Sequence, residues 1–357
     1  IPSLDLFSYE DRLKQFSMQF LSSYTDLFEW VSIMTGGFPE PYTFGRRLKK
    51  FLANKEFNYD VLHDNQSLAS SLLELQKKFP LVTTIHHPIS RDYNLELNST
   101  SGFKDRLLIK RWHSFLSMQK RVANKLDNIL CVSEQSAQDV SEDFNVSLDK
   151  ISVVLNGVDM DVFFPNKKVK KMPHRIITTA SADIPLKGLE YLIKSLPKIL
   201  SAYPDSSLEV IGRAQIGGVV DTFIKDLNLQ HVVNFNYGLS EKEIASLYNS
   251  SDLAVIPSLY EGFGFGAAEA MACGLPTIST GSGGLSEVIG DAAYRIVSGS
   301  EDAISHAVMD LFQDSAKKNI IADKGLERMK QEFTWLRAGK ETISSYQEAI
   351  NTFNQAK

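Results

Sequence analysis

Apolar and polar positions along the chain follow two different rhythms. In residues 1–55 aromatic and aliphatic side chains recur at intervals of three and four, from Phe16 to Val31, which predicts helices. From Tyr59 onward, short apolar runs rich in β-branched residues alternate with helical patterns. Because strands that alternate with helices form parallel sheets, this second rhythm predicts an α/β protein of the doubly wound type.

Four strands are predicted in the first half, at 60–63, 81–85, 128–132 and 151–155, with helices at 67–77 and 104–125. A complete doubly wound sheet of this kind carries about six strands. The chain also opens on Ile1 and not on Met. We therefore expect a truncated N-terminal domain that lacks its first strand or strands and the glycine-rich turn after strand one.

The second half predicts a complete sheet. Its six strands are expected at 175–181, 207–211, 232–236, 253–257, 277–280 and 293–297, with helices between them. A polar, lysine-rich stretch, Pro165 to Pro173, is typical of a linker before this half, and a final helix is expected from Thr334 to Gln355. Ligands in such sheets bind beyond the carboxyl ends of the strands.

The stretch from Ser258 to Pro276 changes character every few residues. Alternating glycines and phenylalanines after the strand at 253–257 predict a loop whose backbone approaches a ligand closely, and a helix is expected from Ala267 to Cys273. Strand, glycine loop and helix in this order direct free backbone N–H groups and the positive end of the helix dipole at an anion. Glu261 is predicted at the strand tip and Glu269 in the first helical turn, where an acid can simply complement the dipole.

These two glutamates, with seven residues between them that include Gly-Phe-Gly and with Gly-Leu-Pro following, form a specific pattern. It resembles the donor-site signature of retaining glycosyltransferases of the GT-B fold, specifically glycosyltransferase family 4. The resemblance implies that Glu269 binds the ribose hydroxyls of a nucleotide. It implies that Glu261 meets the donor sugar and diphosphate together with the loop backbone at Phe263, Gly264, Phe265 and Gly266.

The same resemblance implies an architecture of two doubly wound, Rossmann-like domains facing a central cleft. Residues 1–156 would form the N-terminal acceptor-side domain and 157–335 the C-terminal donor domain. Residues 336–357 would form a helix that crosses back to the first domain. Asn156 to Asp159 looks like the inter-domain joint of the family, and Gly283 to Glu287 resembles its downstream glycine pair.

A donor diphosphate carries two negative charges, so the site needs cations. Lys187, which precedes Gly188, stands where the family places its phosphate lysine; a solvated turn is the alternative interpretation. The family usually has an arginine five residues earlier, where this chain has Ala182. Our hypothesis is that Arg213, at the end of the next strand, supplies the missing charge, because each such donor is typically worth roughly a hundredfold or more in rate.

Histidines mark the carboxyl ends of the first-half strands. By resemblance, His86 matches the sugar-contacting histidine of the family. A metal pair with His87 is disfavoured, since neighbours on a strand point to opposite faces, and His87 is expected to serve local structure. His63, Asp64 and Asn65 are candidates for acceptor binding.

Tyr237 and Gly238 follow the strand at 232–236 and are expected to hold the nucleotide base, mainly through backbone groups. A plain turn is an equally good interpretation of these two residues. No Asp-x-Asp metal motif stands out, so we predict metal independence and no cofactor beyond the nucleoside-diphosphate sugar that acts as co-substrate.

Composition narrows the function further. The chain has 357 residues, 43% of them hydrophobic, which is enough for about two domains. A net charge of -5 gives no footprint for nucleic acid. The two cysteines, Cys131 and Cys273, lie in apolar runs and are typical of a reduced, cytoplasmic protein.

No apolar run reaches the roughly 18 residues that span a bilayer. A membrane-surface helix within residues 1–55 is an alternative to core packing, so at most peripheral contact with the inner membrane face is expected.

Together these features predict a retaining glycosyltransferase. It would move a sugar from a nucleoside-diphosphate sugar to a hydroxyl of a glycan, a lipid-linked or a small-molecule acceptor, in cell-surface polysaccharide or glycoconjugate synthesis. One alternative is a GT-B hydrolase or epimerase that acts on the nucleotide sugar alone. Another is a non-catalytic nucleotide-sugar-binding module, suggested by the missing N-terminal loop. A dehydrogenase is disfavoured, because no Gly-x-Gly-x-x-Gly opens either domain.

Overall fold

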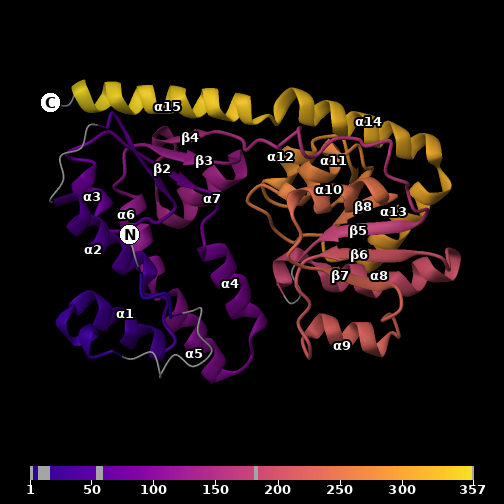
Figure 1. Ribbon diagram of the computed structural model, residues 1–357, viewed down its shortest axis with the longest axis horizontal. Helices are drawn as coiled ribbons and strands as arrows, with labels where there is room; N and C mark the ends of the chain where they lie inside the picture. The colour runs from indigo at the N-terminus through magenta and orange to yellow at the C-terminus, as the bar shows by residue number, and fades with distance from the viewer. Residues whose placement is uncertain (1–2, 7–16, 54–58, 181–183, 356–357) are drawn as a thin grey trace. The chain divides into compact units, whose positions relative to one another are not determined.

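The computed structural model describes residues 3–6, 17–53, 59–180 and 184–355 (Figure 1). The chain forms two compact units. The first comprises Ile1–Val154 together with Glu341–Lys357, and the second comprises Leu155–Lys340. Each is an α/β unit built on one parallel sheet.

The N-terminal unit contains a sheet whose four described strands lie in the order β1-β2-β3-β4, all parallel. The strands are β1 (Leu62–Asn65), β2 (Leu81–Ile85), β3 (Ile129–Cys131) and β4 (Ile151–Val153). Every residue of β3 is buried, as a strand in the middle of a parallel sheet requires. The predicted number of strands is confirmed for the described residues, and β2 has the predicted bounds.

One strand prediction is wrong by two residues. The strand expected at 60–63 is β1, at Leu62–Asn65, because its pairing begins at Leu62 opposite Leu81. His63 therefore lies within the strand and not at its end. The local pattern could not reveal this shift, since Leu-His-Asp-Asn carries little apolar periodicity and only its ladder with β2 defines it.

Helices surround this sheet. The first 55 residues contain a short 3-10 helix η3 (Met18–Ser22) followed by α1 (Tyr24–Met34) and α2 (Glu40–Ala53), in agreement with the predicted helical pattern; Phe16 lies outside the described residues. Further described α-helices of the unit are α3 (Leu72–Leu75), α4 (Ser90–Ser99), α5 (Phe103–Trp112), α6 (Leu116–Ala123) and α7 (Glu134–Phe144).

Two helix predictions in this unit need correction. The helix expected at 67–77 shrinks to the single turn α3, because Gln66 and Leu68 have left-handed backbones with φ of 59° and 48°. The helix expected at 104–125 divides into α5 and α6 around a 3-10 turn η4 (His113–Phe115). That turn places His113 and Phe115 in the protein interior.

The second unit has six described strands in the order β10-β9-β8-β5-β6-β7, all parallel. They are β5 (Arg175–Thr179), β6 (Ser207–Ile211), β7 (Val233–Asn236), β8 (Leu253–Ile256), β9 (Thr277–Ser279) and β10 (Tyr294–Arg295). All six predicted strands are present, most of them one or two residues shorter than expected. The strand order runs outward in both directions from the β5–β8 pair, so the topological switch point lies there.

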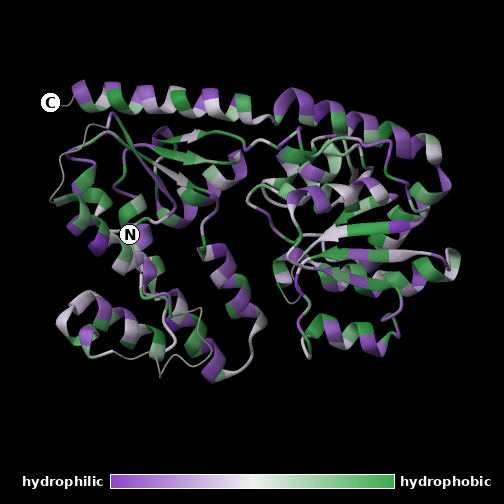
Figure 2. Cartoon of the chain, viewed as in Figure 1, coloured by the Kyte–Doolittle hydropathy of each residue, from purple (hydrophilic) through white to green (hydrophobic). Residues whose placement is uncertain are grey.

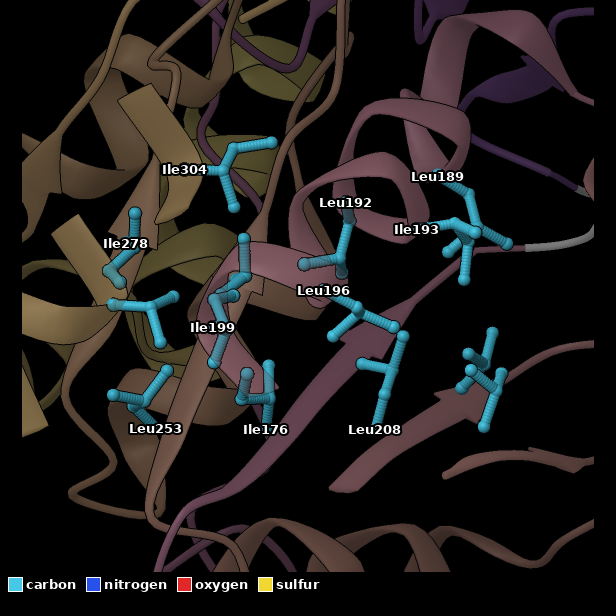
Figure 3. Close-up of a cluster of buried hydrophobic side chains, with 14 of the residues drawn as sticks. Ile176, Leu189, Leu192, Ile193, Leu196, Ile199, Leu208, Leu253, Ile278 and Ile304 are labelled. Atoms are coloured by element: carbon cyan, nitrogen blue, oxygen red, sulfur yellow. The ribbon is translucent and has the colours of Figure 1, made fainter. Parts of the chain in front are cut away.

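Helices cover both faces of this sheet. They are α8 (Leu189–Ala202), α9 (Val219–Asp226), α10 (Glu241–Ser250), α11 (Phe265–Ala272), α12 (Leu285–Ile289), α13 (Glu301–Gln313) and α14 (Ser315–Glu332). Figure 3 shows the core on one face, where Leu192, Leu196 and Ile199 of α8 belong to one buried cluster with Ile176 of β5 and Leu253 of β8. Alternate strand residues such as Ile177 face the other side. In Figure 2 hydrophobic residues along the strands of this sheet accordingly lie among white and purple ones.

The last described element is α15 (Trp335–Gln355), the helix predicted for the tail. Hydrophobic and hydrophilic residues alternate along it in Figure 2. Its residues from Glu341 onward belong to the N-terminal unit, where the Tyr346 hydroxyl lies 2.5 Å from Nδ1 of His63.

Candidate active site

The second unit brings two predicted site residues together at its switch point. Lys187 ends the 3-10 turn η6 (Pro185–Lys187) after β5, and Glu261 lies in the loop after β8. The Lys187 ammonium is 2.7 and 3.0 Å from the two Glu261 carboxylate oxygens. Ser258 donates a hydrogen bond of 2.9 Å to the same carboxylate. The pair remains accessible, with 33% of the Lys187 side chain and 14% of the Glu261 side chain exposed.

Glycine at position 188 allows the two loops to meet. Gly188 has a left-handed backbone with φ of 62°, and a Cβ atom there would lie 2.1 Å from the Pro257 carbonyl oxygen. Only glycine adopts this backbone without steric cost. One residue before Lys187, the Leu186 carbonyl accepts a hydrogen bond of 2.7 Å from the Leu259 N–H. The backbone around Lys187 is therefore tied to the loop that carries Glu261.

The adjacent glycines Gly283 and Gly284 support the backbone of Glu261. The Glu261 carbonyl accepts a hydrogen bond of 2.8 Å from Gly284 N–H, and Glu261 forms an isolated parallel bridge with Gly283. A Cβ atom at Gly283, whose φ is 67°, would lie 2.4 Å from that carbonyl oxygen. The sequence signal at Gly283 to Glu287 therefore reflects close backbone approach to Glu261.

The helix after the glycine loop begins earlier than predicted. Gly264, with φ of 108°, is the N-cap, and α11 begins at Phe265 and not at Ala267. Glu269 consequently lies in the second turn of α11, which corrects its predicted place in the first. A Cβ atom at Gly264 would meet Leu285 of α12 at 2.5 Å, so a contact distant in sequence determines this helix start.

The two phenylalanines of the loop have different environments. Phe263 is buried, with ring centroids 5.0 Å from Phe265 and 5.9 Å from Phe333. Phe265 is 44% exposed. Of the two, Phe263 therefore anchors the loop in the interior, whereas Phe265 presents much of its ring to solvent.

Glu269 has an unusual electrostatic environment. Burial raises the pKa of its carboxyl from 4.5 to about 7, although a hydrogen bond from Tyr248 opposes the rise. The Tyr248 hydroxyl is 3.3 Å from Oε2 of Glu269. Gly266, at the start of the same helix, packs against Thr179 at the end of β5, where a Cβ atom would be 2.9 Å from the threonine Cβ. A poorly solvated carboxylate of this kind is well suited to accept hydrogen bonds from hydroxyl groups of a ligand.

Arg213 and Tyr237 lie together at the carboxyl ends of the paired strands β6 and β7. The Arg213 guanidinium carbon is 4.5 Å from the centroid of the Tyr237 ring, within the range of a cation–π contact. Tyr237 is 66% exposed, and a Cβ atom on Gly238 would meet nothing within 4 Å. Ala182, which stands at the arginine position of the resembling family, lies outside the described residues.

In the N-terminal unit His86 follows β2 and is held on both its ring and its backbone. Its Nε2 lies 2.8 Å from Oδ1 of Asn65, and its backbone N–H donates to Oε1 of Gln66 at 2.7 Å. Its carbonyl accepts a bond of 2.9 Å from Ser136 Oγ. Burial, followed by the neighbouring His87 and His63, lowers the pKa of His86. The ring is therefore neutral at neutral pH, and because Asn65 presents its oxygen, Nε2 carries the proton.

The other first-half candidates have local partners. His63 lies between Tyr346 and Thr84, with its Nε2 2.7 Å from the threonine hydroxyl. Asp64 is only 8% exposed, and it accepts hydrogen bonds from the Ser67 hydroxyl and from Leu68 N–H at 3.3 Å. Asp64 thus stabilises the turn after β1, and its low exposure disfavours the predicted role in acceptor binding.

Local structure also accounts for His87, whose Nε2 lies 2.8 Å from a carboxylate oxygen of Asp92.

The sequence contains one Asp-x-Asp triplet, at Asp159 to Asp161, which was not recognised as a candidate metal motif. There the Asp161 N–H donates a hydrogen bond of 2.9 Å to the Asp159 carboxylate within a turn. Among the residues that the structure describes, no group of three or more His, Cys, Asp or Glu could hold a metal ion. The metal independence of the reaction stays a prediction.

Sequence inspection missed Tyr248 and Ser258, which both contact predicted site residues. Tyr248 occupies an apolar-face position of α10 and resembles an ordinary core residue, while Ser258 is one of many loop serines. Only proximity in the folded unit distinguishes them. None of the described helices has both the length and the apolar character needed to cross a membrane.

Comparison with known proteins gives matches to two family models that together cover most of the chain. Residues 10–162 match the model described as Glycosyltransferase Family 4, and residues 162–328 match the one described as Glycosyl transferases group 1. The boundary between them falls close to the junction of the two structural units.

Individual proteins are also similar over most of the chain. An MMP α-(1→4)-mannosyltransferase of Mycolicibacterium hassiacum is 36% identical over 354 residues, which cover 98% of this chain and 85% of the relative. Among solved structures, the sucrose-phosphate synthase of Thermosynechococcus elongatus has a TM-score of 0.72 at 20% identity and covers 87% of this chain and 78% of its own. Anabaena HepE, solved with UDP and glucose, has a TM-score of 0.68 at 18% identity, with 84% and 80% covered.

Proposed function

Because the chain belongs to glycosyltransferase family 4 and is a glycosyltransferase of the GT-B fold, we propose that it transfers a sugar from a nucleoside-diphosphate sugar to an acceptor hydroxyl with retention of anomeric configuration. The observation that carries this proposal is the ion pair of Lys187 with Glu261 at the switch point of the second unit. Parallel sheets bind their ligands outside the carboxyl ends of the strands at such a point.

The diphosphate, the ribose and the sugar of the nucleotide-sugar donor each have a proposed binding group in this unit. Lys187 would approach the diphosphate, and the backbone N–H groups at the start of α11 would add the positive end of a helix. Glu269 would accept hydrogen bonds from the ribose hydroxyls. Glu261 would contact the sugar, next to the lysine whose charge it partly neutralises in the free protein.

Arg213 and Tyr237 extend the donor site toward β6 and β7. In our proposal Arg213 supplies the cation that position 182 lacks, and Tyr237 with Gly238 borders the base. Replacing Arg213 with alanine should lower transfer roughly a hundredfold. Unchanged donor turnover in Arg213→Ala would remove this residue from the site.

In the transfer step the acceptor oxygen forms a bond to the anomeric carbon as the bond to the diphosphate oxygen breaks. The acceptor attacks on the face from which the diphosphate departs, and the departing oxygen takes the acceptor proton. The protein lowers the barrier chiefly by positioning and by fixed positive charge at the leaving group. His86, neutral with its Nε2 proton directed to Asn65, would orient the sugar hydroxyls.

The acceptor is proposed to be a carbohydrate or a lipid-linked sugar. A mannosyltransferase is 36% identical to the chain, which favours a mannosyl donor as the first to test, and the UDP and glucose bound to HepE favour a glucosyl donor as the second.

The test has two stages. A thermal-shift screen of nucleoside diphosphates and their sugars should identify one base, since a ligand at a hundred times its dissociation constant stabilises the protein by about 2.7 kcal/mol. The selected donor is then incubated with and without mono- and oligosaccharide acceptors, and NMR determines the products and their anomeric configuration. An α-linked product from an α-linked donor supports the proposal.

The same experiment separates the alternatives. Free sugar or an epimerised donor, formed equally well without acceptor, would indicate a hydrolase or an epimerase. Donor binding without any turnover, also in a chain extended at its N-terminus, would indicate a binding module. An inverted product would refute the retaining mechanism.

A further inference from the structure

The hydroxyl of Tyr248 lies at a buried junction of three segments of the second unit. Tyr248 belongs to α10 and is fully buried, one of the largest side chains in the interior. Its hydroxyl is 2.7 Å from Thr179 Oγ1 at the end of β5, 3.3 Å from the Gly266 carbonyl oxygen and 3.3 Å from Oε2 of Glu269. A buried phenol with three polar neighbours is more than core filling, because apolar packing alone needs no hydroxyl.

The protons in this group can be assigned from hydrogen-bond chemistry. A tyrosine hydroxyl has one proton to donate and can also accept. The Gly266 carbonyl and an ionised Glu269 only accept, so Thr179 is the neighbour that can donate to Tyr248. Tyr248 then directs its own proton toward Glu269 and the Gly266 carbonyl. The result is a directed chain from Thr179 through Tyr248 to the carboxylate.

The surrounding packing keeps this chain in one orientation. The Tyr248 ring meets Phe163 edge-on, with centroids 6.3 Å apart. Gly266 fits against Thr179 so closely that a Cβ atom would lie 2.9 Å from the threonine Cβ. With β5, α10 and α11 packed in this way, the hydroxyl has little freedom to turn away from Glu269.

We propose that Tyr248, oriented by Thr179, is a positioning residue that fixes the direction and the proton occupancy of the Glu269 carboxylate, and thereby sets donor affinity. This inference rests on the proposed role of Glu269 in binding the donor ribose. Tyr248 itself is buried behind the carboxylate and acts through it, without touching the donor.

The groups around Glu269 predict in which direction its pKa changes when the Tyr248 hydroxyl is removed. Burial raises the pKa of Glu269, the hydrogen bond from Tyr248 lowers it, and the negative charge of Glu241, also on α10, raises it. The Cys273 thiol, one turn further along α11, lies near the carboxylate, and burial followed by that negative charge raises the pKa of the thiol to about 12, so the thiol stays neutral. Removal of the phenol hydroxyl should therefore raise the pKa of Glu269 further.

The primary variant is Tyr248→Phe, measured by steady-state kinetics with the donor selected in the screen. We expect the donor KM to rise about five- to tenfold, in line with the loss of one ordinary hydrogen bond, while kcat at saturating donor changes less than about twofold. The pH midpoint of donor binding should move to higher pH. A role in stability alone would lower the amount of folded enzyme and leave KM and the pH midpoint unchanged.

Two further comparisons keep the test informative if Tyr248→Phe folds poorly. Thr179→Val removes the hydroxyl that donates a hydrogen bond to Tyr248, at nearly constant side-chain volume, and should also raise KM. Thr179→Ser keeps a hydroxyl and should have the wild-type KM. Tyr294→Phe is the matched control, because it deletes another tyrosine hydroxyl of this unit that bonds to a carboxylate, Asp310. It should leave KM and the pH midpoint unchanged.

Glu269→Gln separates this inference from the proposed function. Donor affinity unchanged in Glu269→Gln would refute the role of Glu269 on which the inference rests. If Glu269→Gln weakens binding but Tyr248→Phe and Thr179→Val leave both KM and the pH midpoint as in the wild type, the positioning role of Tyr248 is wrong and the proposed function stands. If the inference holds, adding Tyr248→Phe to Glu269→Gln should weaken binding less than Tyr248→Phe does alone.

Discussion

Acidification from pH 8 to pH 6 should weaken binding of the nucleotide-sugar donor about tenfold. Burial raises the pKa of Glu269 to about 7. Such a carboxyl is ionised in about 90% of molecules at pH 8 and in about 10% at pH 6. The ionised form is the one that offers both oxygens as acceptors to two ribose hydroxyls. Because the apparent dissociation constant varies inversely with the competent fraction, it should rise about tenfold across this interval.

Isothermal titration calorimetry with the intact donor is the suitable assay. A nucleotide sugar is a diphosphate diester without a titrating group in this pH range, whereas a free nucleoside diphosphate has a terminal phosphate whose pKa is about 6. Glu269→Gln is the matched variant: it keeps the shape of the side chain and removes the ionisation. It should bind the donor more weakly than the wild type at pH 8 and show little change between pH 8 and pH 6.

Two results would contradict this reasoning. A wild-type dissociation constant that is flat between pH 6 and pH 8 would mean that Glu269 does not titrate there or does not meet the donor. A slope shared by the wild type and Glu269→Gln would assign the titration to another group. Thermal unfolding of both proteins at each pH verifies that the folded unit is present throughout.

Further variants test the rest of the site. Lys187→Met should lower kcat/KM by about a hundredfold or more, because it removes fixed positive charge from the leaving diphosphate, and circular dichroism should show an intact fold. His86→Ala should lower kcat/KM about tenfold through a lost hydrogen bond to the sugar, whereas His87→Ala should leave it near the wild-type value. Gly188→Ala should reduce the free energy of unfolding by at least about 1 kcal/mol more than Gly238→Ala, because both glycines have positive φ but only the first would place a Cβ against backbone; chemical denaturation measures the difference. A chelator should leave the transfer rate unchanged, and loss of activity that added Mg²⁺ or Mn²⁺ restores would refute metal independence.

The sequence by itself determined the class of fold and supplied the candidate residues of the donor site. The strands β2 and β6 have the predicted bounds, because short runs rich in apolar and β-branched residues, which strands buried in a parallel sheet favour, are visible locally. Lys187, Glu261 and Glu269 became candidates through their spacing to glycines and through the family pattern, and their role toward a ligand stays a prediction.

Only the tertiary structure decided which of these residues meet and where several elements begin. Gly264 becomes the N-cap of α11 against Leu285, and β1 takes its register from Leu81, so neither boundary could be found from the nearby residues alone. Lys187 contacts Glu261 because the switch point brings β5 beside β8. Tyr248 looks like core in the sequence, and only packing places its hydroxyl beside Glu269. Local patterns record the burial of each segment, whereas a site depends on which buried segments lie side by side.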